Sequence, residues 1–111
     1  MLIYFRTKKL QKTCSLNREM QKQWGDKMAR KLQQRMAELK AADTIADISH
    51  LPPPRCHALT NDRAGQFSVD LLHPYRLLFI PANDPIPLRV DGGINLLCVT
   101  EIEIIEIEDT H

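Results

Sequence analysis

The residues of this chain that can carry chemistry are two histidines, one acid and two arginines. Asp109 and His111 close the chain, and their i, i+2 spacing puts both side chains on one side of an extended strand. His57, Arg63 and Arg76 come earlier. If all five met, they would suit metal-independent cleavage of a phosphodiester. One group would take the proton from a ribose 2′-hydroxyl, another would protonate the leaving oxygen, and the arginines would stabilise the phosphate charge.

Each of these residues also has a purely structural interpretation. Arg76 is a cation inside an otherwise apolar run, so it needs an anion, which can be a ligand phosphate or a carboxylate of Asp70 or Glu103. His57 can be a surface residue at a strand edge, and Arg63 can be a solvated turn residue. The spacing alone does not bring the residues together.

Metal binding has little support in the pattern. His57, His73, Asp109 and His111 could supply ligands, but no HxH or HExxH spacing is present. The chain also has no glycine-rich phosphate loop and no serine or cysteine in a nucleophile motif. We therefore predict neither a metal nor another cofactor.

The first half of the chain predicts helices after a short strand over residues 2–5. Apolar residues recur there at helical spacing, at Leu16, Met20, Trp24, Met28, Leu32, Met36 and Leu39. Gly25 interrupts the pattern and Asp26 can cap a new helix, so we expect two helices, the second covering residues 26–42. Residues 43–48 are typical of a capped helical turn, and the prolines at 52–54 end any helix.

The second half of the chain predicts strands. Residues 67–71 alternate between apolar and polar, as in a half-buried strand, and residues 75–80 are apolar enough for a central strand. Residues 81–93 indicate a long loop. A last strand is expected from about Leu96 to Ile107, with a bulge at Ile104-Ile105 where the apolar phase changes. The prediction is a single α+β domain over residues 1–111, with two N-terminal helices packed on a small, mainly antiparallel sheet.

Charge is divided between the two halves. Residues 1–56 hold twelve Lys and Arg against five Asp and Glu, a difference of +7, and residues 57–111 hold three against nine, a difference of −6. A basic surface can attract a polyanion, although a solvated, lysine-rich helix face gives the same count. The cysteines are odd in number and widely spaced, the start is too short for a signal peptide, and no stretch approaches membrane-spanning length. We expect a soluble cytoplasmic protein.

Several local motifs, taken in order, resemble the HigB-type toxins of bacterial toxin–antitoxin systems, within the RelE/ParE superfamily. The similar segments are Ile3-Tyr4-Phe5-Arg6 with Lys9-Leu10, residues 31–39 with Ala41-Ala42, His57-Ala58-Leu59, residues 62–69, Tyr75-Arg76-Leu77-Leu78-Phe79, and Glu108-Asp109-Thr110-His111. The resemblance implies a RelE-like fold and ribosome-dependent mRNA cleavage that a helix-turn-helix, HigA-like antitoxin blocks. Operator DNA would be bound only through that antitoxin.

The resemblance also assigns residues. His57, Arg76, Asp109 and His111 match the family's catalytic positions, and Arg63 matches its turn arginine. With Lys27, Arg30 and Lys31 of the basic helix, Arg63 would contact RNA. Three positions depart from the family pattern, because Thr60 stands for a lysine, Asp70 for a basic residue and Thr110 for an aromatic that would stack on a base.

Two other functions fit the same resemblance. One is a non-enzymatic toxin that poisons DNA gyrase, as in the ParE branch, and the other is a toxin-like binding partner with degraded chemistry.

Overall fold

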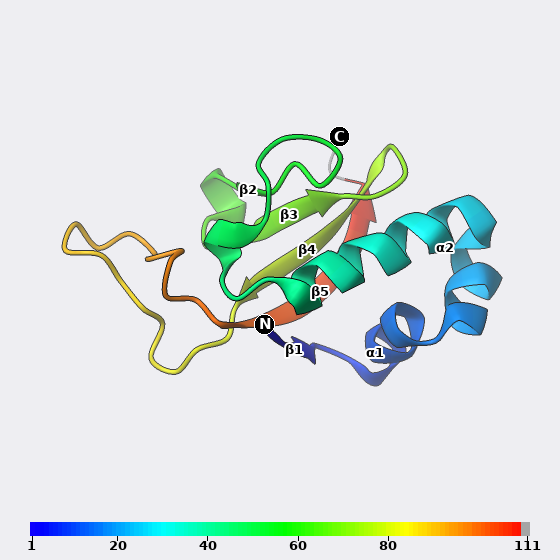
Figure 1. Cartoon of the computed structure of the whole chain (residues 1–111), viewed down its shortest axis with the longest axis horizontal. Helices are drawn as coiled ribbons and strands as arrows, with labels where there is room; N and C mark the ends of the chain where they lie inside the picture. The colour runs from blue at the N-terminus through cyan, green and yellow to red at the C-terminus, as the bar shows by residue number, and fades with distance from the viewer. Residues whose placement is uncertain (110–111) are drawn as a thin grey trace.

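The computed structural model describes residues 1–109 and shows helices on one side of a sheet (Figure 1). The elements in chain order are β1 (Leu2–Phe5), α1 (Lys8–Ser15), α2 (Asn17–Ala41), the short 3₁₀ helix η1 (Ile45–Asp47), β2 (His57–Ala58), the 3₁₀ helix η2 (Asn61–Arg63), β3 (Phe67–Asp70), β4 (Tyr75–Pro81) and β5 (Glu101–Asp109). Thr110 and the predicted site residue His111 lie outside the described residues.

The five strands form one sheet in the order β1-β5-β4-β3-β2. β1 pairs with β5 in parallel, and all other pairs are antiparallel. β4 lies between β5 and β3, so the prediction of a central strand is confirmed. The predicted α+β class, with helices on a mainly antiparallel sheet, is also confirmed.

The helices begin and break where local chemistry requires it. The Thr7 hydroxyl accepts a hydrogen bond from the Leu10 amide at 3.1 Å and caps α1. Gly25 has φ 81° and ψ 171°, a conformation that essentially only glycine adopts, so it interrupts α2 where the sequence predicted a break. A second interruption was not predicted. Leu16 is extended and 50% exposed, because it joins α1 to α2 and does not contribute to the apolar stripe.

The core lies between α2 and the helix-facing side of the sheet. Its fully buried members include Leu32 and Leu39 of α2 and Leu77 and Phe79 of β4. Trp24 packs edge-on against Tyr75, with ring centroids 5.0 Å apart. The helix-spaced apolar residues and the alternate residues of the strands thus meet across one interface.

β5 begins later than predicted and contains the predicted bulge. Residues 96–100 belong to the long loop, shown in yellow and orange in Figure 1, and the strand starts only at Glu101. Leu78 pairs with Glu106 while the next residue, Phe79, pairs with Ile104, so Ile105 has no partner across the β4–β5 ladder. The extra residue shifts the alternation of β5 by one position. Glu103 and Glu106 therefore both lie on the face of the sheet away from the helices.

Candidate active site

The candidate site lies on the face of the sheet opposite the helices. Residues paired directly across antiparallel strands point to the same face. One row across the sheet is Asp70, Arg76 and Glu108, and the next row on this face is His57, Ser68, Leu78 and Glu106. The register therefore brings His57 and Arg76 to one surface, two strands apart.

Arg76 is paired with a carboxylate of the same chain. Its Nε lies 3.6 Å from Asp70 Oδ1, and its side chain is 16% exposed. Arg55 binds the same carboxylate through two hydrogen bonds, Nε to Oδ2 at 2.7 Å and Nη2 to Oδ1 at 3.0 Å. The structural interpretation of Arg76 is confirmed, since Asp70 is one of the two acids expected to pair with it. Asp70 also stands at the position where the HigB-type pattern described above has a basic residue.

Arg63 reaches the site from η2. It is hydrogen-bonded to Glu108 of β5, so the turn arginine is not simply solvated. Ser68 was expected on the wet side of a half-buried strand, but it is fully buried and its Oγ has no hydrogen-bond partner among the described residues. The burial of Ser68 shows that this part of the face is closed to solvent.

Arg35 is a supporting residue that the sequence analysis did not single out. It is only 2% exposed, donates from Nε to the Asp70 carbonyl at 2.7 Å, and pairs through Nη1 with Glu38 at 3.1 Å. It ties the end of β3 to α2 and so positions Asp70. A signal was present, because residue 35 falls within the apolar stripe between Leu32 and Leu39.

Asp109 lies on the face of the sheet opposite to Arg76. It pairs with Tyr75, and the alternation of β5 puts it on the helix-facing side of the sheet while Glu108 points to the site. The strand register therefore puts His57 and Arg76 on one face of the sheet, two strands apart, and Arg63 reaches that face through Glu108, whereas Asp109 belongs to the other face. Within residues 1–109, no group of three or more His, Cys, Asp or Glu side chains could hold a metal ion.

Glu106 is a titratable residue of this face that sequence reasoning missed. Partial burial raises the pKa of its carboxyl, and the hydrogen bond and negative charge of Glu108 raise it further, while Arg63 and Arg6 lower it. Glu108 Oε2 is buried and has no other hydrogen-bond donor among the described residues, so a proton on Glu106 can satisfy it.

We predict that Glu106→Gln stabilises the fold at neutral pH. A carboxyl whose pKa is higher folded than unfolded contributes stability at low pH, and that contribution is lost as the pH rises through the folded value. The gain over wild type should grow from about pH 4 to pH 7 and stay below about 1 kcal/mol, because the group is largely exposed. Urea unfolding at both pH values measures it. Glu19→Gln on α2 is the control, and an equal gain there would contradict the prediction.

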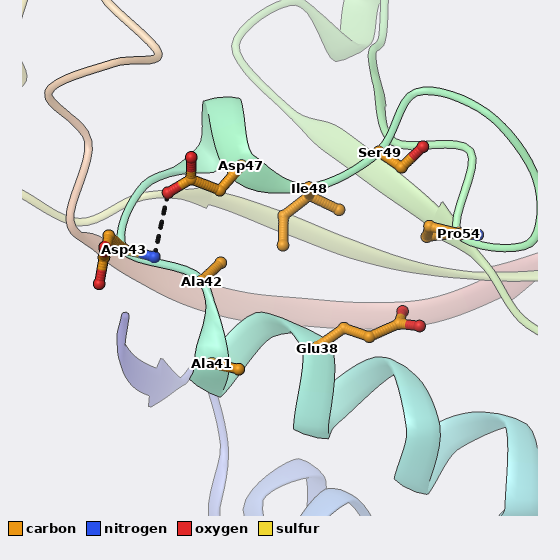
Figure 2. A pocket seen from close by; sticks show the side chains of 8 residues that line it. All are labelled: Glu38, Ala41, Ala42, Asp43, Asp47, Ile48, Ser49 and Pro54. Atoms are coloured by element: carbon orange, nitrogen blue, oxygen red, sulfur yellow. Dashed lines mark hydrogen bonds between the residues drawn. The ribbon is translucent and has the colours of Figure 1, made fainter.

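The predicted RNA-binding residues of α2 share one surface hollow. Lys27, Arg30, Lys31, Gln34 and Leu72 line a cavity of about 380 Å³ on the outer side of α2. A larger hollow of about 580 Å³ lies at the end of α2 (Figure 2). Two of its three acids are already engaged, since Glu38 pairs with Arg35 and Asp47 accepts from the Asp43 and Thr44 amides.

No protein-family model and no curated protein matches this chain. Among solved structures it is similar to the YoeB/ParE toxin from Agrobacterium tumefaciens, with a TM-score of 0.60, 13% sequence identity and 100% of each chain covered. The chain has the fold of a YoeB/ParE toxin. The resemblance noted in the sequence agrees with this neighbour at the level of the toxin fold. An identity of 13% shows the shared fold and does not assign the chain to the HigB branch. Within residues 1–109, no helix has both the length and the apolar character needed to cross a membrane.

Proposed function

We propose that this chain is the toxin of a toxin–antitoxin pair, a single cytoplasmic domain over residues 1–111 that cleaves mRNA on the ribosome. The observation that supports this most directly is the face of the sheet opposite the helices. It carries Arg76 together with Arg55, Arg63 and the carboxyl of Glu106. Arginine is the side chain best suited to hold a phosphate in a fixed orientation. The partner would be a helix-turn-helix antitoxin of the HigA kind.

In this proposal Arg76 binds the scissile phosphate and stabilises the charge that develops on it. His57 lies two strands away, about 10 Å across the sheet, so a nucleotide can span the gap between them. In this proposal Glu106, whose pKa is raised by burial and by the neighbouring Glu108, exchanges the proton, and it takes the place that Asp109 had in the expectation from sequence. His111 completes the proposed set from the end of the chain.

Phosphate binding here requires an exchange of partners. Arg55 and Arg76 both contact Asp70, and Arg63 contacts Glu108. An incoming phosphate must displace these carboxylates or share the guanidinium groups with them, which weakens binding compared with unpaired arginines. The reaction we propose therefore depends on the ribosome to supply further contacts to the message.

The same pairing favours a second candidate, a toxin of this fold without nuclease activity that acts on gyrase, or one kept only for binding the antitoxin. In this alternative the arginines only hold the sheet face together through their carboxylate partners, and they bind no phosphate. A gyrase poison would block supercoiling and leave mRNA intact.

Induced expression of the chain in bacteria, with and without a cognate helix-turn-helix protein, tests the proposal. We expect growth to stop without the antitoxin and primer extension to reveal new 5′ ends in translated mRNA. Growth arrest with intact mRNA and inhibited supercoiling would favour the gyrase alternative. Normal growth without the antitoxin would overturn both active toxin functions.

A further inference from the structure

The outer side of α2 carries a hollow with cations and no acid among its lining residues. Lys27, Arg30 and Lys31 line it together with Gln34 and with Leu72 from the hairpin between β3 and β4. The hollow measures about 380 Å³, a volume in the range of small-ligand sites. Spacings of three and four residues put the cations and Gln34 on one side of the helix.

These cations differ from the arginines of the sheet face. Arg55, Arg63 and Arg76 each lie against a carboxylate. In the part of the chain that the structure describes, no carboxylate comes within ion-pair distance of Lys27, Arg30 or Lys31, and the ion pairs found all involve other residues. Lys27, Arg30 and Lys31 can therefore bind an anion without first releasing a carboxylate, as Lys8, Lys9 and Lys12 of α1 also can, and on α2 these cations line a hollow together with Gln34 and Leu72.

Leu72 connects this hollow to the candidate active site. Its side chain is 38% exposed and lines the hollow. The next residue, His73, lines a small cavity of about 70 Å³ with Arg55, Asp70 and Arg76. The two cavities thus lie on adjoining residues of one hairpin.

We propose that this hollow is a subsite for one nucleotide of single-stranded RNA next to the one bound at Arg76. The cations would contact its phosphate and the next one along the strand, Leu72 would pack against the face of the base, and Gln34 Oε1 would accept a hydrogen bond from its edge, since Gln34 Nε2 donates to Glu38. RNA is favoured over an acidic peptide because the hollow combines cations with the apolar Leu72 and with Gln34, which suit the phosphate, the face and the edge of one nucleotide. The inference rests on the proposed function in taking RNA as the ligand.

Binding of a labelled, 2′-O-methylated oligoribonucleotide to the full chain, without ribosomes, tests the inference. The methyl group removes the nucleophile, so binding is measured without cleavage. We expect the triple variant Lys27→Gln, Arg30→Gln, Lys31→Gln to bind at least tenfold more weakly by fluorescence anisotropy, with a shallower dependence on salt. The triple variant Lys8→Gln, Lys9→Gln, Lys12→Gln on α1 removes the same charge and should lose less than twofold.

A second comparison tests the base contact. Leu72→Ala should weaken binding several-fold, whereas Leu51→Ala, which removes a 60% exposed leucine elsewhere, should not. Equal losses in the two triple variants, no binding of the oligoribonucleotide by the folded wild type, or equal binding of a polyglutamate peptide would each overturn the inference. Intact mRNA in the expression experiment, together with tight and selective RNA binding here, would overturn the nuclease function and leave the subsite standing.

Discussion

Replacing Arg76 by alanine is expected to lower the rate of ribosome-dependent mRNA cleavage by about 10² to 10³-fold, the usual loss when a group that stabilises transition-state charge is removed. Arg76 is the central cation of the site face, in the same row as Asp70 and Glu108, and it is mostly buried. A charge held there acts in a medium less polar than water, so its interaction with a phosphate is stronger than at the surface.

Cleavage of a translated message in a purified system, with rates taken under single-turnover conditions, measures this effect. Arg89→Ala is the matched control, because Arg89 is a well-exposed arginine in the long loop and should leave the rate unchanged. Arg76→Lys keeps the charge but loses the planar fork, so it should recover only part of the rate. Wild-type cleavage by a folded Arg76→Ala variant would remove Arg76 from the site.

Replacing Phe79 by alanine is expected to lower the free energy of unfolding by about 3 to 5 kcal/mol. Phe79 is fully buried in the central strand and stacks on Phe67 of β3, with ring centroids 5.9 Å apart. The change removes the ring and leaves a cavity between the sheet and α2, which the close-packed core cannot fill.

Urea denaturation followed by circular dichroism measures the loss. For a chain of this size, such a change is a large part of the total stability, so the variant can be partly unfolded in buffer alone. Leu97→Ala is the control, since Leu97 is 74% exposed in the long loop and should change the stability by less than about 0.5 kcal/mol. A loss below about 1 kcal/mol for Phe79→Ala would mean that the core relaxes around it.

Much of the architecture was predictable because it depends on local periodicity. The helix-spaced residues of α2, the glycine at its break, the central strand and the bulge at Ile105 all leave a pattern within a few neighbouring residues. The break at Leu16 left none, since a leucine at helical spacing gives the same pattern whether it is buried or joins two helices. The start of β5 was placed too early for a related reason, because residues 96–98 are apolar but belong to the loop.

The amino-acid types alone indicate which residues can bind a phosphate or move a proton, and which segments carry them. The partners of these residues and the face on which each lies depend on strand register, which becomes visible only in the folded chain. One residue of register turns a side chain to the other face, so Asp109 is turned from the site while Glu106 and Glu108 are turned toward it. Which carboxylate neutralises Arg76, and which cations stay unpaired on α2, likewise depends on contacts between residues far apart in the chain.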